Sequence, residues 1–145
     1  MPFVRASVVL AAVTAALAVP LVVLAGDAAK TQAAPSFAFG RTGGNIVPSK
    51  TVISSTGRVT SDNSVPTTKG PVSLAARNGL VKLARAEGFF TMANTSCTGT
   101  NPDIASQFVT VTAGGKSRTV TVHGACSASF NELYAVISAV AGAGP

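Results

Sequence analysis

Two short runs of alternating valine and threonine constrain the fold of this chain more than any other feature. Residues 108–112 read FVTVT, residues 118–122 read RTVTV, and Gly114 and Gly115 lie between them. Alternation with a period of two is typical of a β-strand with one buried face, and a two-glycine connection is typical of a tight hairpin. The pattern therefore predicts two antiparallel strands joined by a turn.

The position of the turn sets which side chains share a face of this hairpin. A turn at the two glycines pairs Val109 with Val120 and Val111 with Arg118. Because cross-strand partners point to the same side, the valines gather on one face, and Phe108 and the threonines gather on the other. We expect the valine face to pack in the core and the threonine face to be solvated or to bind a ligand.

Three further strands are expected before the first helix. Phe37 and Phe39 alternate with small residues, which indicates a strand. The β-prone runs 51–55 and 58–61 flank a glycine and indicate a second hairpin. The segment 62–71 contains two prolines and a glycine and is predicted to be a loop.

Two amphipathic helices have recognisable ends. The first is capped by Ser73, ends at Gly88, and keeps its basic residues, among them Arg77, mostly off the apolar stripe of Leu80, Leu83 and Ala84. The second opens with SFNE at 129–132, the pattern of a capping box. Its apolar stripe consists of Phe130, Leu133, Ile137 and Val140.

The elements follow one another as β-β-β-α-β-β-α. This order predicts the α+β class, with an antiparallel sheet of about five strands and two helices packed on one face. We divide the chain into a signal peptide at 1–25, a flexible leader at 26–35, a single α+β domain at 36–142 and a tail at 143–145.

The N-terminal segment has the composition of a secretory signal peptide. Arg5 precedes an apolar run, 8–25, that carries no charge and ends in small residues. The alternative is an uncleaved membrane anchor, but the run is near the lower limit of roughly 18 residues for a spanning helix, and Pro20 would weaken that helix. We therefore expect a secreted or cell-envelope protein that meets the membrane only if this segment is retained.

Cys97 and Cys126 are the only cysteines and both lie in the exported part. In an oxidising compartment such a pair is expected to form a disulfide. A redox site favours a closer C-x-x-C spacing, and a metal site needs more ligands than a chain with the single histidine His123 offers. We predict no metal and no cofactor.

Catalytic and charge-driven functions find little support. His123 continues the threonine alternation, so we expect it to be exposed, and no Ser-His-Asp arrangement is visible around it. The chain carries a net charge of +6, but its cations are scattered singly, which does not favour nucleic-acid binding. The sequence therefore predicts a non-enzymatic protein.

Several motifs together resemble a known group of domains. They are FGRTGG at 39–44, the helix with Leu80 and Leu83, GFF at 88–90, Asp103 ahead of FVTV, RTVTV, and the last helix with Leu133. This order is similar to small secreted bacterial α+β domains that include the emfourin type, proteinaceous inhibitors of thermolysin-like metalloproteases. The resemblance implies a sheet backed by helices and a non-enzymatic role. The cysteine pair and the loop at 62–71 depart from the emfourin pattern, so no inhibitory residue is carried over.

The sequence favours an exported, disulfide-stabilised domain that binds a protein partner through loops or a sheet face. Protease inhibition is one role of this kind. The alternative is a cell-envelope protein whose basic surface contacts anionic wall polymer or lipid. The candidate binding residues are Arg41, Thr42, Gly43, Gly44, Asn45, Asp103, Phe108, Thr110 and Thr121.

Overall fold

The valine–threonine hairpin is present with the predicted register. Strands β5 (Ser106–Ala113) and β6 (Lys116–His123) pair antiparallel through the two-glycine turn, and Val109 lies opposite Val120. The four valines of the inner face are 0% exposed. Because each valine alternates with a threonine, one pairing register fixes the buried side of both strands.

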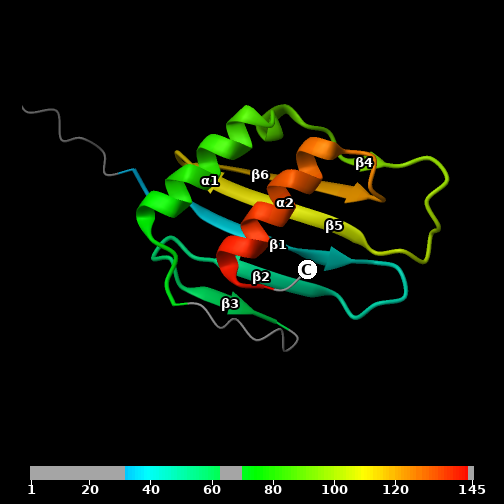
Figure 1. Cartoon of the computed structure of the whole chain (residues 1–145), viewed down its shortest axis with the longest axis horizontal. Coiled ribbons are helices and arrows are strands. Elements are labelled where there is room, and N and C mark those ends of the chain that lie inside the picture. The colour runs from blue at the N-terminus through cyan, green and yellow to red at the C-terminus, as the bar shows by residue number, and fades with distance from the viewer. Residues whose placement is uncertain (1–31, 63–69, 144–145) are drawn as a thin grey trace, which may run out of the picture. The chain divides into compact units, whose positions relative to one another are not determined.

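The hairpin belongs to a six-stranded sheet in the order β3-β2-β1-β5-β6-β4 (Figure 1). The computed structural model describes residues 32–62 and 70–143. Neighbouring strands are antiparallel except β4 and β6, which are parallel. The two-residue β4 was not predicted, because so short a strand shows no alternation in sequence. The remaining strands are β1 (Ser36–Thr42), β2 (Ser49–Ile53), β3 (Val59–Ser61) and β4 (Thr95–Ser96).

Both helices cover one face of the sheet, as the sequence predicts (Figure 1). They are α1 (Leu74–Ala86) and α2 (Ala128–Ala141), and the short 3-10 helix η1 (Phe89–Thr91) follows α1. The fold is therefore α+β, with its core between this helical layer and the inner face of the sheet. The largest fully buried side chains are Phe37, Phe89, Phe130, Ile53, Leu133, Ile137, Val109, Val111, Val120 and Val122.

The ends of α1 follow the sequence prediction. The hydroxyl of Ser73 accepts a hydrogen bond from the amide of Ala76 at 3.1 Å. Gly88 adopts the left-handed φ of 68° that ends a helix. The chain then enters η1, where Phe89 is fully buried.

Arg77 is buried, and its predicted position off the apolar stripe is wrong. Its side chain is 5% exposed. The guanidinium donates to the carbonyl oxygens of Val72 at 3.3 Å and Pro35 at 3.1 Å, and also to that of Ser55. A buried polar group is tolerated when its donors are satisfied, so these carbonyls allow the cation to lie in the core. Arg77 thereby joins α1 to the start of β1 and to the β2–β3 turn.

The predicted capping box of α2 is wrong. The helix begins at Ala128, with Ser127 at the N-cap position, and no side chain caps it. The loop before it is held in two other ways. The side-chain amide of Asn131 donates to the carbonyl of Ala125 at 3.2 Å, and Cys126 is tied by a disulfide. The helix start therefore does not depend on a side-chain cap.

The predicted disulfide between Cys97 and Cys126 is present, with a Cα–Cα distance of 5.7 Å. It ties the segment after β4 to the loop that leads into α2. The predicted signal peptide, most of the leader and most of the 62–71 loop lie outside the described residues. In the part of the chain that is described, no helix is both long and apolar enough to cross a membrane.

Candidate functional site

The candidate binding residues fall on two sides of the sheet. Arg41 and Asp103 line one groove on the side that the helices cover. Phe108, Thr110 and Thr121 alternate with the buried valines and therefore lie on the opposite face. The structure thus divides the candidates between a groove and the sheet face that the helices do not cover.

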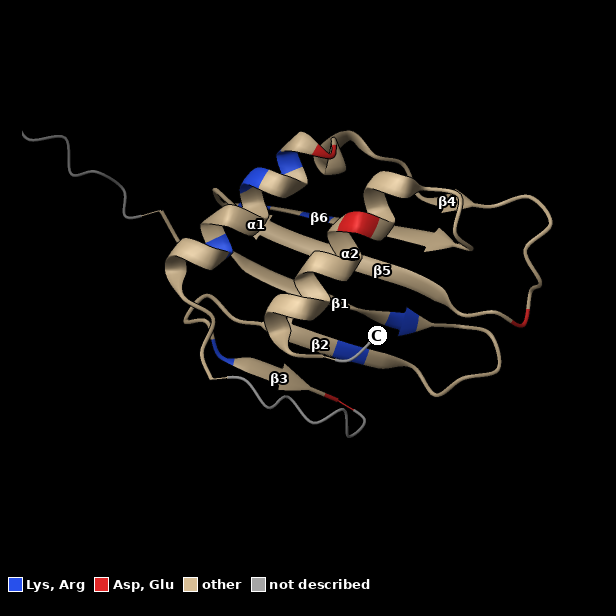
Figure 2. Ribbon diagram, in the orientation of Figure 1, with Lys and Arg blue, Asp and Glu red and all other residues tan. Residues whose placement is uncertain are grey.

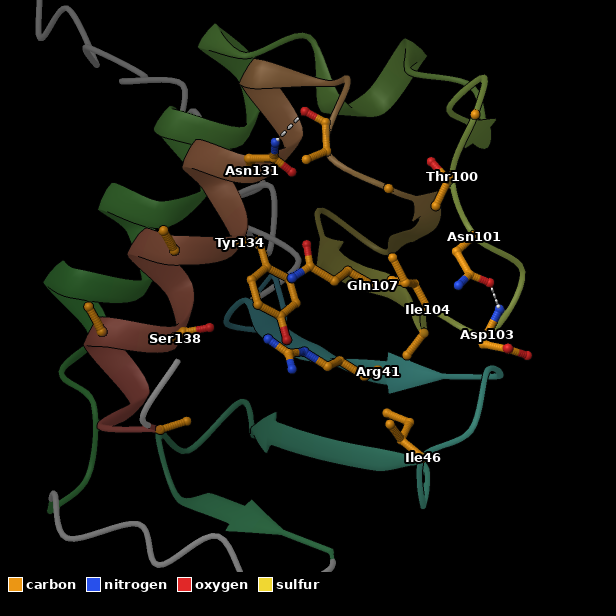
Figure 3. A pocket seen from close by; sticks show the side chains of 17 residues that line it. Arg41, Ile46, Thr100, Asn101, Asp103, Ile104, Gln107, Asn131, Tyr134 and Ser138 are labelled. Carbon is orange, nitrogen blue, oxygen red and sulfur yellow. Dashed lines mark hydrogen bonds between the residues drawn. The ribbon is translucent and has the colours of Figure 1, made fainter.

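The groove runs between α2 and the segment 99–107, and its volume is about 1130 Å³ (Figure 3). Most of its surface is apolar. Ile46 and Ile104 lie across from α2 and are 41% and 52% exposed. The residues that line it are Arg41, Ile46, Gly99, Thr100, Asn101, Asp103, Ile104, Ala105, Gln107, Gly124, Ala125, Asn131, Tyr134, Ala135, Ser138, Ala139 and Ala143.

The alternation of side chains along β1 explains why the groove contains a cation, Arg41. Phe37, Phe39 and Arg41 occupy every second position of β1, so all three point to the helical side. The two phenylalanines are buried, whereas Arg41 lies past the edge of the core and is exposed. Its cross-strand neighbour in β5 is Gln107, which lines the same groove.

Tyr134 forms the polar base of the groove together with Arg41. Its ring packs edge-on against Phe39, with centroids 5.8 Å apart, and stacks on Phe130 at 6.2 Å. Figure 3 shows the Arg41 guanidinium beside the Tyr134 hydroxyl. Burial raises the pKa of this phenol, while the positive charge of Arg41 and a hydrogen bond from its side chain oppose that rise. The hydroxyl therefore stays protonated at neutral pH and can donate to a ligand.

Two loops meet at the rim of the groove. The amide of Asn45 donates to the carbonyl of Asp103 at 3.0 Å, and the amide of Asp103 donates to the side chain of Asn101 at 2.9 Å. Gly44 packs so closely that an added Cβ would lie 2.4 Å from the Asp103 carbonyl oxygen. Gly44, Asn45 and Asp103 thus shape the groove through their backbone. Thr42, the last residue of β1, and Gly43, which follows it, are both exposed.

The opposite face of the sheet carries Phe108 and paired threonine and serine hydroxyls. The hydroxyls of Thr110 and Thr119 are 2.8 Å apart, and Phe108 lies between Gly40 and Thr121 in the register. Phe108, Thr110 and Thr121 are half-buried there. They are available for contact on the side of the sheet that the helices leave uncovered.

His123 is half-buried, and its predicted exposure is wrong. Its Nδ1 lies 3.2 Å from the hydroxyl of Ser106, a residue that the sequence did not single out. The two are brought together because β5 begins where β6 ends. Within residues 32–62 and 70–143, no cluster of three or more His, Cys, Asp or Glu side chains could hold a metal ion.

The charged side chains are distributed singly over the described elements (Figure 2). Lysines and arginines lie on α1, on β1 and β2, before β3 and on β6, and the few acids are spread among them. The cation inside the groove, Arg41, is thus separate from the exposed Lys82 and Arg85 of α1.

Among the groove residues that the sequence did not single out are Ile46, Ile104, Gln107 and Tyr134. The sequence gives little sign of their role. Ile46 and Ile104 are single apolar residues in loops, and Gln107 and Tyr134 belong to regular strand and helix patterns. No family model, no curated protein and no solved structure matches this chain. A function is therefore inferred from the geometry and chemistry of the groove.

Proposed function

We propose that this chain is an exported, non-enzymatic binding domain that recognises a protein partner through the groove beside α2. The observation that carries the proposal is the apolar groove of about 1130 Å³ with Ile46 and Ile104 exposed at its edge. Large apolar side chains that remain exposed beside a concave surface are typical of interaction sites.

Two further features support export and a preformed site. The N-terminal residues have the composition of a signal peptide, and the disulfide suits an oxidising compartment. Cys97 lies two residues before the segment 99–107 that forms one wall of the groove. A wall fixed by a cross-link and by the Asn45–Asp103 hydrogen bond loses little conformational freedom on binding, which favours affinity.

The test compares two substitutions on neighbouring residues of α2. Ala135 lines the groove and is exposed, whereas Val136 is 37% exposed and does not line it. Ala135→Arg fills the groove with a long cationic side chain, and Val136→Arg adds the same charge outside it. Each of the three chains is used as bait in the culture medium of the producing cells. We expect the wild-type chain and Val136→Arg to capture the partner protein and Ala135→Arg to capture none. Equal capture by all three chains would contradict the proposal.

A second candidate function is protease inhibition, in which the bound partner is a protease. The exposed β1–β2 connection favours it. Val47 in the β1–β2 connection is 75% exposed, the most of any large hydrophobic side chain described. A protruding apolar side chain suits the substrate pocket of a protease better than a concave groove does. Titration against a thermolysin-like metalloprotease tests this form: inhibition that Val47→Asp abolishes would support it, and absence of inhibition would remove it.

Binding to an anionic envelope polymer is distinguished by its salt dependence. Charge-driven binding weakens steeply when added salt shortens the Debye length to about 3 Å at roughly 1 M, whereas an apolar interface changes less. We expect partner capture to persist at high salt. Loss of all capture in high salt would instead favour the cell-envelope role, in which the scattered cations make the contacts.

A further inference from the structure

The groove holds a positive charge that its neighbouring acid does not neutralise. Arg41 is exposed at the base of the groove and contacts the Tyr134 hydroxyl. Asp103 is the one acid among the residues that line the groove, and its side chain points away from Arg41 in Figure 3. An arginine in this position remains able to donate its hydrogen bonds to an incoming anion.

Apolar surface lies on both sides of this charge. One side is formed by α2, whose Ala135 is among the lining residues. On the other side Ile46 and Ile104 project from the loops (Figure 3). The guanidinium of Arg41 and the hydroxyl of Tyr134 lie between these walls. A ligand with an anion in its middle and apolar groups at both flanks therefore complements the groove.

The two apolar walls favour an extended peptide segment as the ligand. The groove measures about 1130 Å³, which is room for several neighbouring side chains. A C-terminal carboxylate would leave one wall uncovered, because its chain extends in a single direction. An acidic side chain within a continuous segment leaves neighbours on both sides to cover both walls.

We propose that the groove recognises a segment of the partner protein in which an Asp or Glu side chain lies between apolar side chains. The carboxylate accepts hydrogen bonds from the Arg41 guanidinium, whose planar fork matches its geometry, and from the Tyr134 hydroxyl. The flanking apolar side chains contact Ile46 and Ile104 on one wall and α2 on the other. This inference rests on the proposed function and specifies the chemistry of the partner.

A matched pair of peptides tests the role of the carboxylate. The probes are acetylated, amidated Gly-Leu-Val-Glu-Leu-Val-Gly and its Gln counterpart, titrated calorimetrically into the oxidised full chain. We expect the Glu peptide to bind about tenfold more tightly, in line with the usual value of a hydrogen bond to a charged group. Arg41→Gln should remove this preference, and Arg58→Gln, an exposed arginine before β3, should keep it. Equal affinity of the two peptides for the wild-type chain would overturn the inference.

Selection from a displayed library of random short peptides separates this inference from the proposed function. Peptides are retained if they bind the wild-type chain but not Ala135→Arg. Enrichment of Asp or Glu between apolar residues supports the inference. Groove-dependent peptides without an acid overturn the inference and leave the proposed function standing. If no peptide binds and laurate, an apolar carboxylate, occupies the groove instead, both proposals fail.

Discussion

The guanidinium of Arg41 contacts the hydroxyl of Tyr134, although 93 positions separate the two residues in the chain. The strand alternation of β1 carries Arg41 past the core, and packing against Phe39 and Phe130 holds the tyrosine ring in place. Two packed aromatic contacts thus position a neutral donor beside a permanent cation. This pair forms the polar base of an otherwise apolar groove.

Titration of the phenol measures this contact directly. Tyr134 is the single tyrosine of a chain without tryptophan. The ultraviolet absorbance change on deprotonation therefore reports on this phenol alone. Burial raises its pKa above the ordinary 10.0, and Arg41 lowers it in part. Arg41→Gln should therefore shift the titration to still higher pH. A downward shift, or none, would contradict the contact.

The same pKa shift makes stability depend on alkaline pH. A folded-state pKa above the unfolded value means that the contribution of Tyr134 is complete below pH 10.0 and declines as pH rises through the folded pKa. We expect the free energy of unfolding, measured with guanidinium, to fall over that range. Tyr134→Phe should flatten this part of the profile, since phenylalanine has no proton to lose.

Arg77 should contribute strongly to stability despite its charge. Replacement by Met leaves the carbonyls of Val72, Pro35 and Ser55 without their donor, which should cost about 3 kcal/mol. Lys82→Ala, at an exposed position of the same helix, should change stability by less than about 0.5 kcal/mol. Denaturant unfolding of both variants checks the difference. Equal effects would mean that the buried hydrogen bonds contribute nothing.

The contact between the two rim loops can be isolated with a pair of glycines. Gly43 and Gly44 both have positive φ, 73° and 61°, so alanine costs about 1–2 kcal/mol of backbone strain at either position. An added Cβ meets nothing within 4 Å at Gly43 but lies 2.4 Å from the Asp103 carbonyl oxygen at Gly44. Gly44→Ala should therefore be more destabilising by at least about 1 kcal/mol. Thermal unfolding of the two variants measures this difference. Equal midpoint temperatures for Gly43→Ala and Gly44→Ala would rule out tight packing of the loops.

The disulfide should stabilise the fold and preserve the groove. The two cysteines are 29 positions apart, and the loop-entropy model values such a cross-link at roughly 3.5 kcal/mol. The double variant Cys97→Ala, Cys126→Ala should lose about this much in denaturant unfolding, and its affinity for the groove partner should also fall. A variant with unchanged stability would show that packing alone fixes the wall at 99–107.

Sequence predicted the elements whose patterns are local. The period-two runs and the glycine pair determined the β5–β6 register, and Ser73 and Gly88 determined the ends of α1. The start of α2 was missed because the loop before it is fixed by Asn131 and by the Cys126 disulfide, partners that a capping pattern does not contain. Arg77 was missed because its carbonyl partners come from distant segments. Tyr134 and Ile104 likewise line one groove only because α2 packs beside the 99–107 loop. No local sequence pattern predicts that packing.

Hydrogen exchange of the chain in complex with its captured partner tests the central claim most directly. If the partner lies in the groove, amides of the 43–47 and 99–105 loops should exchange more slowly in the complex. Exchange at the residues of the threonine face, 110, 119 and 121, should not change. Protection confined to that face, with the loops unaffected, would contradict recognition through the groove.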